Sequence, residues 1–141
     1  MDYIKSKEIS QRMCETNDCA VKAIAIACDV PYRVAHKALE LQGRKKRGGS
    51  ALSWIHNAIK GLGFEINAVD TTAKTITSLP RDRQHNQGYY IALVSGHVAA
   101  MVDGQVEDWS EGRRNRIKVL YKITPATTRK QRKQLMKELF A

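Results

Sequence analysis

The spacing of apolar residues along the chain changes from helical to strand-like near residue 63. Before that point apolar residues that recur every three or four positions predict helices over residues 31–42 and 50–62. A run of alanines behind the possible capping residues Thr16, Asn17 and Asp18 predicts another helix over residues 18–28. Beyond residue 63 the apolar residues alternate with polar residues or form short apolar runs. This second pattern predicts strands over residues 64–68, 89–95, 98–102, 105–109 and 117–123. Helices followed by an antiparallel meander of strands indicate an α+β domain, with the helices packed on the sheet.

Three other segments are less regular. Residues 1–16 form a polar lead-in with some helical tendency, and residues 71–87 contain a short strand or a turn before Pro80. The last segment, from about Thr127 to Ala141, is predicted to be a basic amphipathic helix. We therefore divide the chain into a main domain, residues 1–125, and a basic C-terminal helix, residues 126–141.

Two local features of the pattern are informative. The predicted helix over residues 18–28 is apolar almost all round, which is typical of a helix buried in the centre of a domain. Asp103-Gly104 lies between two predicted strands and is a strong signal for a two-residue hairpin turn. Such a turn pairs Val102 with Gln105 and sets the register of the two strands.

Composition and charge narrow the classes of protein that need to be considered. The chain has 141 residues, of which 43% are hydrophobic, enough for one compact domain and too few for two. Its net charge of +10 favours acidic partners, such as nucleic acid, an anionic membrane surface or an acidic protein. One basic cluster is our candidate for binding such a partner, and its residues are Arg44, Lys45, Lys46 and Arg47. Two further basic clusters lie at residues 113–118 and 129–137.

The basic clusters have a second interpretation, which is a solvated surface with no specific partner. Aromatic residues make up only 6% of the chain, and none is interleaved with the clusters as a base-stacking surface requires. The N-terminus lacks the apolar core of a secretory signal, and no segment approaches the ~20 apolar residues of a membrane span. We therefore expect a cytoplasmic protein without a membrane span.

Cys19 is the candidate nucleophile. Three cysteines, an odd number, argue against a disulfide framework in a reducing compartment, so at least one thiol is free. A cysteine attacks only as the thiolate, and the N-terminus of a helix lowers its pKa. Cys19 lies in the first turn of the predicted central helix, whereas Cys14 precedes that helix and Cys28 lies at its far end. Position alone therefore selects Cys19.

An activated thiol needs a base beside it, and histidine is the usual choice. His97 follows a glycine and begins an apolar strand, where it is either a core residue or a positioned base. We interpret His36 and His56 as surface or helix-packing residues, and His85 as a solvent-exposed residue of a polar loop.

The predicted hairpin also provides an acid for the base. It places Asp108 on the same face of the sheet as His97, on a diagonal that side chains can span. Asp108 is therefore the candidate that orients the imidazole, unless a one-residue shift of register brings Glu107 there instead. For the oxyanion of an acyl intermediate, the backbone N–H of Cys19 is one donor, and the side chain of Asn17 is the candidate for a second. Gln11 is the alternative, and Asn17 could instead cap the helix.

The cysteine, histidine and acid in this order resemble the papain-like cysteine peptidase superfamily. The matching pieces are Asn17–Ala23 at a helix start, Gly96-His97-Val98 on a strand, and Asp103-Gly104 through Asp108-Trp109 on the next. The resemblance is to small bacterial branches, namely the leader peptidases of bacteriocin exporters and NlpC-type peptidases, and to small phage-encoded proteins. The exporter peptidases place an oxyanion glutamine six residues before the cysteine, where this chain has Met13.

This resemblance implies a papain-like fold and thiol-dependent cleavage of a peptide or isopeptide bond, in the host cytoplasm if the protein is phage-encoded. Cys19 would form an acyl-enzyme, His97 would move the proton and Asp108 would orient His97. The substrate would be a protein or peptide. The basic surface of the protein suggests that this substrate is acidic. Related acyl-transfer or deamidating reactions fit the same residues.

Two alternatives remain open. The first is a non-catalytic domain of the same fold that binds nucleic acid or an acidic host protein through its basic clusters. The second is a metal site built from the three cysteines and a histidine, although their spacing matches no common zinc signature. We expect no metal and no other cofactor.

Overall fold

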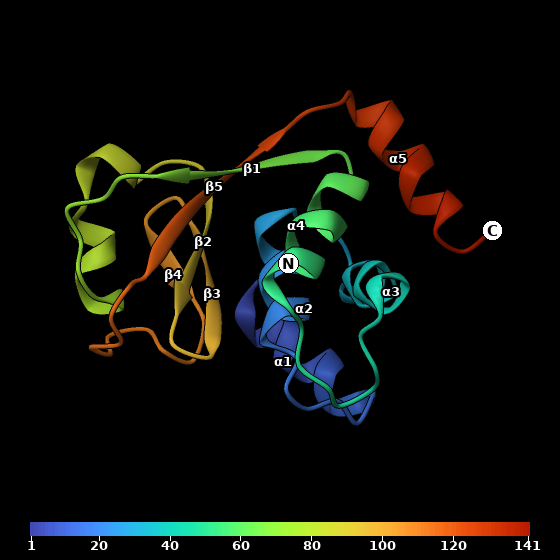
Figure 1. Cartoon of the computed structure of the whole chain (residues 1–141), viewed down its shortest axis with the longest axis horizontal. Coiled ribbons are helices and arrows are strands. Elements are labelled where there is room, and N and C mark those ends of the chain that lie inside the picture. The colour runs from blue at the N-terminus through green and yellow to red at the C-terminus, as the bar shows by residue number, and fades with distance from the viewer.

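The computed structural model describes the whole chain, residues 1–141, and is an α+β fold with its helices packed on a five-stranded antiparallel sheet (Figure 1). Four helices precede the first strand, and they are α1 (Tyr3–Arg12), α2 (Cys19–Ala27), α3 (Tyr32–Gln42) and α4 (Leu52–Gly61). The three predicted helices are confirmed, with ends within two residues of those predicted. The fourth, α1, lies in the segment that showed only some helical tendency. Asp2 begins it by accepting the N–H of Lys5.

Local sequence explains where these helices end. α3 follows Pro31, which suits the first turn of a helix, and stops at Gly43, whose φ of 123° is in the region that favours glycine. α2 differs from the others because it is buried along nearly its whole length. The residue at its N-cap, Asp18, makes no capping hydrogen bond, because its carboxylate accepts the hydroxyl of Tyr32 at 2.6 Å instead.

The sheet departs from the predicted meander. Its strands are β1 (Phe64–Val69), β2 (Tyr89–Val94), β3 (His97–Val102), β4 (Gln105–Glu107) and β5 (Val119–Pro125). Their order is β1-β5-β2-β3-β4, so only β2, β3 and β4 are successive neighbours, and β5 lies between β1 and β2. The physical reason lies in β5 itself, which buries Leu120 on one face of the sheet and Tyr121 and Ile123 on the other. A strand that is apolar on both faces is most stable in the interior of a sheet.

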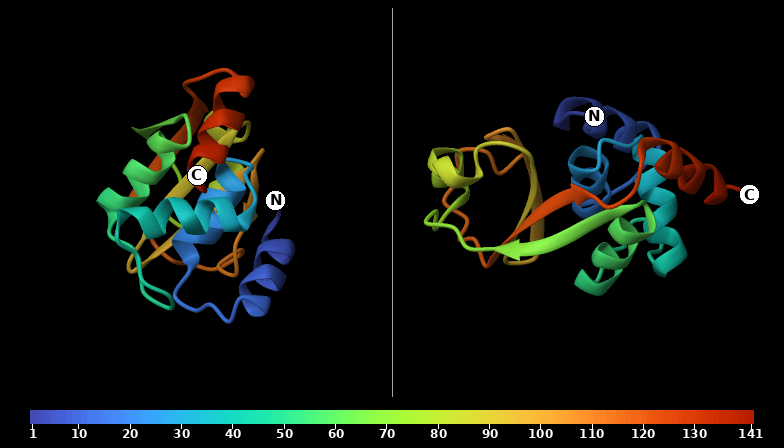
Figure 2. Two further views of the ribbon diagram at one scale, coloured as in Figure 1. Left: turned by 90° about the vertical axis from the view of Figure 1, so that its right-hand side faces the viewer. Right: turned by 90° about the horizontal axis from the view of Figure 1, so that it is seen from above.

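The sheet separates two hydrophobic cores, one on each face. Helices α1 to α4 cover one face, and the residues between β1 and β2 cover the opposite face (Figures 1 and 2). Those residues form two short 3₁₀ helices, η1 (Ile76–Arg81) and η2 (Arg83–His85), in the segment that the sequence left as a strand or a turn. The larger core is therefore between the sheet and α2, which lies directly against β3.

His85 is a correction to the sequence analysis. It is buried, with 7% of its surface exposed, and its two ring nitrogens contact the hydroxyl of Tyr90 and the backbone oxygen of Asp70. Its polar neighbours in sequence suggested exposure, but η2 turns the ring back toward the sheet.

The C-terminal segment forms helix α5 (Arg129–Glu138), which the hydroxyl of Thr128 caps. None of its residues is fully buried, although Met136 and Leu139 pack against the main core. In Figure 1 it lies far from β3 and β4. None of the helices has the length and the apolar content that crossing a membrane requires.

Candidate active site

The structure brings Cys19, His97 and Asp108 together from three elements. Cys19 is the first residue of α2, His97 is the first residue of β3, and Asp108 directly follows β4. His97 donates from Nε2 to Oδ2 of Asp108 at 2.6 Å, and its ring lies beside the thiol of Cys19. Because Nε2 is engaged by Asp108, Nδ1 is the ring nitrogen that can exchange a proton with Cys19.

The end of β4 explains how the thiol reaches the sheet. β4 pairs with β3 only as far as Ala100 opposite Glu107, so the first residues of β3 have no strand beside them on that edge. The backbone N–H of Val98 is therefore free of a strand partner and lies near enough to the sulfur of Cys19 to lower the pKa of that thiol. Strict alternation would place His97 on the face of Ala99, away from α2. Its position at the uncovered start of β3 allows the ring to contact Cys19 nonetheless.

The environment favours a thiolate paired with an imidazolium. Burial acts to raise the pKa of Cys19, but the hydrogen bonds from His97 and from the N–H of Val98 outweigh it, and the pKa is lowered. Burial acts to lower the pKa of His97, but the hydrogen bonds to Asp108 and to Cys19 outweigh it and raise that pKa to about 9. A cysteine of lowered pKa beside a histidine of raised pKa is the condition for a reactive thiolate near neutral pH.

Asp108 is held firmly in its orienting position. Ser110, which is completely buried, donates its backbone N–H to Oδ2 of Asp108 at 3.0 Å and its hydroxyl to the same oxygen at 2.5 Å. Glu107 points elsewhere, and its carboxylate accepts the N–H of Tyr3 at the start of α1. The register that the Asp103-Gly104 turn predicted is confirmed, with Val102 opposite Gln105, and it selects Asp108 rather than Glu107.

The start of α2 provides donors for an oxyanion. Because no side chain caps this helix, the N–H groups of its first turn, beginning with Cys19, are free to bind an anion. Asn17, the predicted second donor, lies beside them and lines a cavity that also contains Cys19 and His97. Its amide nitrogen donates to the backbone oxygen of Arg47 at 3.0 Å, so one of its two N–H bonds is already used.

A cavity of about 280 Å³ opens directly over Cys19 and His97. α4 and the loop before it form one wall, and the turn between β2 and β3 forms the other. Its apolar lining includes Leu52, Ile55 and Leu93. Gly49 and Gly96 line opposite sides, and a Cβ at either position would meet no atom within 4 Å. The thiol is thus accessible to a ligand that lies between the two walls.

Trp109 lies against the ring of His97. Its ring lies 4.8 Å from that of His97, centroid to centroid, and the guanidinium of Arg113 lies 5.5 Å from the centroid of the Trp109 ring. Trp109 is 48% exposed and does not belong to either core.

The basic cluster at residues 44–47 is only partly exposed, which corrects the expectation for Arg44. Arg44 is 4% exposed and donates two hydrogen bonds to the carboxylate of Glu15, at 3.0 and 3.2 Å. Glu15 also contacts Nε2 of His36 at 2.5 Å and accepts the N–H of Arg47. Arg44 is therefore part of a buried ion-pair network, while the side chains of Lys45, Lys46 and Arg47 are exposed.

The other two cysteines lie outside the site. Cys14 is exposed, and Cys28 is buried at the far end of α2, where burial raises its pKa to about 12. No three side chains of the His, Cys, Asp or Glu type come together in a way that could hold a metal ion.

Sequence reasoning missed Ser110, the N–H of Val98 and the contact of Trp109 with His97. Ser110 stands two residues after Asp108, which is the spacing at which a serine commonly hydrogen-bonds an aspartate in a turn, so this signal was available. The other two depend on where β4 ends and how α2 meets β3, which no local pattern reports.

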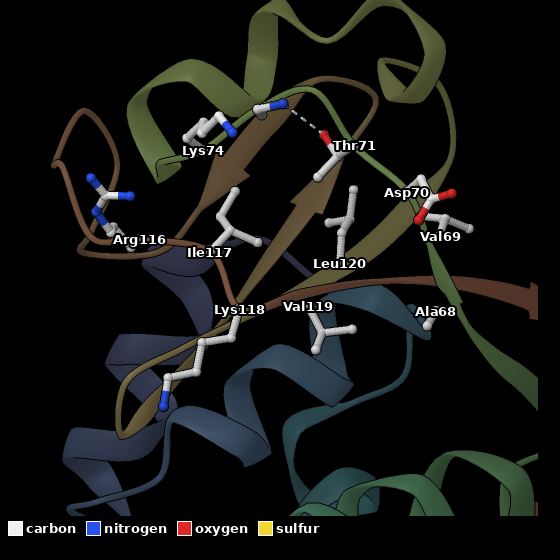
Figure 3. A pocket seen from close by; sticks show the side chains of 11 residues that line it. Ala68, Val69, Asp70, Thr71, Lys74, Arg116, Ile117, Lys118, Val119 and Leu120 are labelled. Carbon is white, nitrogen blue, oxygen red and sulfur yellow. Dashed lines mark hydrogen bonds between the residues drawn. The ribbon is translucent and has the colours of Figure 1, made fainter.

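A second and larger cavity, of about 510 Å³, lies between β1 and β5. The two strands stop pairing at Val69 opposite Leu120, and their chains meet again at the bridge between Thr75 and Arg116. Figure 3 shows the cavity that this opening leaves. Lys74 and Arg116 lie at one end of it, and Asp70 lies at the other.

Comparisons of the chain with models of known families, with curated proteins and with solved structures found no match.

Proposed function

We propose that the protein is a thiol-dependent hydrolase of the papain-like type that cleaves a peptide or isopeptide bond. The observation that carries this proposal is the 2.6 Å hydrogen bond from His97 to Asp108, in a ring that also contacts the thiol of Cys19. The chain order of the three residues and the packing of the cysteine-bearing helix on the sheet support the papain-like assignment.

The geometry suggests the steps of the reaction. The Cys19 thiolate attacks the carbonyl carbon of the substrate, and the N–H groups at the start of α2 stabilise the oxyanion. The imidazolium of His97 then gives its Nδ1 proton to the leaving amine, which produces the acyl-enzyme. Neutral His97 next removes a proton from water, the hydroxide attacks the acyl carbon, and the thiolate leaves as the acid is released. Asp108 stabilises the imidazolium throughout.

The pKa shifts define a pH window for this activity. Reactivity rises as the pH passes the lowered pKa of Cys19, because the thiolate then forms. It falls as the pH passes the pKa of His97 at about 9, because the imidazolium that donates to the leaving group is then lost.

The direct test measures alkylation of each cysteine by iodoacetamide against pH, read by peptide mass mapping in the wild type and in His97→Ala. Cys14 is an internal reference in the same sample because it is exposed and lies outside the site. We expect Cys19 to react at lower pH than Cys14 in the wild type, and this advantage to disappear in His97→Ala. Equal pH profiles for Cys19 and Cys14 in the wild type would exclude the catalytic proposal.

The cavity in Figure 3 supports a second candidate function, which is binding of an anionic partner, nucleic acid or an acidic protein, without catalysis. Lys74, Arg116 and Lys118 line it, and none of them forms an ion pair within the chain. If this is the function, a DNA duplex should bind with a steep salt dependence. Binding should then persist in Cys19→Ala and weaken in the double variant Lys74→Glu and Arg116→Glu.

A further inference from the structure

We propose that the Cys19 site is selective for acidic peptide segments, whose carboxylates contact exposed cations beside Cys19 and beside His97. This inference rests on the proposed function and names the class of its substrate. The cations come from two segments that are far apart in the sequence, the loop of residues 43–51 and the residues that follow Asp108.

The first segment is held rigidly beside Cys19. Asn17, two residues before Cys19, donates to the backbone oxygen of Arg47, and the Arg47 side chain donates from Nε to the backbone oxygen of Cys14 at 3.0 Å. The same loop continues into Gly49, which lines the cavity. The loop that carries these charges is therefore held beside the start of α2 rather than on a free segment. We call Lys45, Lys46, Arg47 and Arg113 the rim of the site.

Most of the positive charge of this loop is not neutralised within the chain. Arg44 is paired with Glu15, but Lys45, Lys46 and Arg47 are exposed and belong to none of the ion pairs. Three cations without a carboxylate create a positive potential that attracts an anionic ligand.

The second segment lies beside His97. Arg113 lies over Trp109, and Trp109 lies against His97, so this cation is two contacts from the imidazole. Two hydrogen bonds fix the backbone of Arg113. Its N–H donates to the backbone oxygen of Ser110, and its backbone oxygen accepts the N–H of Thr77. A carboxylate that stacks beside Trp109 would meet a positioned guanidinium.

Nearly all carboxylates around the site are already engaged. Asp18 accepts from Tyr32 and pairs with Lys22, Glu107 accepts the N–H of Tyr3, and Asp108 orients His97. Glu111 is the one exposed carboxylate that remains near Arg113. The rim therefore carries an excess of positive charge that an acidic segment can balance and a basic segment cannot.

The experiment compares two reagents of similar size that alkylate the sulfur of Cys19 by the same displacement of iodide, iodoacetate to a carboxymethyl thioether and iodoacetamide to a carbamidomethyl thioether. Iodoacetate carries a negative charge and iodoacetamide is neutral. The rate with iodoacetate divided by the rate with iodoacetamide therefore reports the electrostatic potential at Cys19. We would measure this ratio at pH 7 in the wild type, in the double variant Lys45→Glu and Lys46→Glu, and in Arg113→Glu. A matched control for the double variant is Lys130→Glu with Lys137→Glu, which makes the same change in net charge on exposed residues of α5.

We expect the ratio to fall roughly threefold or more in both rim variants, to stay unchanged in the control, and to fall with added salt in the wild type. We also expect poly-glutamate to protect Cys19 from iodoacetamide in the wild type and to lose this effect in the rim variants. An unchanged ratio in the rim variants would overturn the inference. Protection by an oligonucleotide but not by poly-glutamate would also overturn it.

The failure of this inference can be distinguished from the failure of the proposed function. If Cys19 keeps its enhanced reactivity toward iodoacetamide while the rate ratio is the same in the wild type and in the rim variants, only the acidic selectivity is wrong. If Cys19 shows no enhanced reactivity toward either reagent, both are wrong.

Discussion

At the scale of single residues, one carboxylate oxygen organises the site. Oδ2 of Asp108 accepts three hydrogen bonds, one from Nε2–H of His97 and two from the N–H and the hydroxyl of Ser110. Hydrogen bonds to a charged group are stronger than those between neutral groups, and this carboxylate is buried. The orientation of His97 therefore depends on a group that has little freedom to move.

Replacing Asp108 by asparagine tests this role. The amide oxygen can still accept from His97, but the negative charge that helps to raise the pKa of His97 is removed. We expect that pKa to fall from about 9 and alkylation of Cys19 near pH 7 to slow by roughly 10²-fold. The measurement is the iodoacetamide rate against pH.

Glu107→Gln is the matched control for this substitution. It makes the same chemical change one residue earlier, where the side chain binds the N–H of Tyr3, and it should leave the pH profile unchanged. Similar profiles for Asp108→Asn and the wild type would refute the orienting role of Asp108.

At the scale of elements, the loop of residues 43–51 depends on a buried ion pair. The side chain of Glu15 is completely buried and that of Arg44 is 1% exposed, and together with His36 they connect the loop to the segment between α1 and α2. The hydrogen bonds from Arg44, Arg47 and Asn17 hold this loop in place.

Arg44→Ala should be strongly destabilising, because it leaves the carboxylate of Glu15 buried without its main partner. We expect a loss of roughly 3–5 kcal/mol in the free energy of unfolding, measured with urea. Lys45→Ala is the matched control, since its side chain is exposed and should change stability by less than about 0.5 kcal/mol. A small effect of Arg44→Ala would mean that the loop is held by other contacts.

At the scale of the whole molecule, the same network makes stability dependent on pH. Burial acts to raise the pKa of Glu15, but the hydrogen bonds from Arg44, His36 and the N–H of Arg47 outweigh it and lower that pKa to about 2. A carboxyl with a lowered pKa in the folded state binds its proton more weakly there than in the unfolded chain. It therefore adds stability above the unfolded pKa, and this contribution is lost as the pH falls.

We expect the free energy of unfolding to decrease by roughly 3 kcal/mol from this group between pH 5 and pH 2. Urea unfolding at several pH values measures it. Glu15→Gln, although less stable at neutral pH, should show a flatter dependence in the acid range. An equal slope in the wild type and in Glu15→Gln would assign the acid sensitivity to other carboxylates.

The local pattern of the sequence was sufficient to predict much of the candidate site. The apolar helix placed Cys19 at a helix start, and the Asp103-Gly104 turn set a register in which Asp108 and not Glu107 meets His97. Both depend on residues close together in the chain, because a helix repeats over a few residues and a two-residue turn fixes strand pairing.

Only the tertiary structure decided how distant segments meet. The position of β5 inside the sheet, the pairing of Arg44 with Glu15, and the burial of His85 all depend on contacts between separate elements. The polar sequences around Arg44 and His85 suggest exposure, because a pattern of side chains records solvent preference but not an available partner. Which buried polar groups find such partners is determined by packing, and so the sequence alone predicted the residues of the candidate site but not the network that holds them.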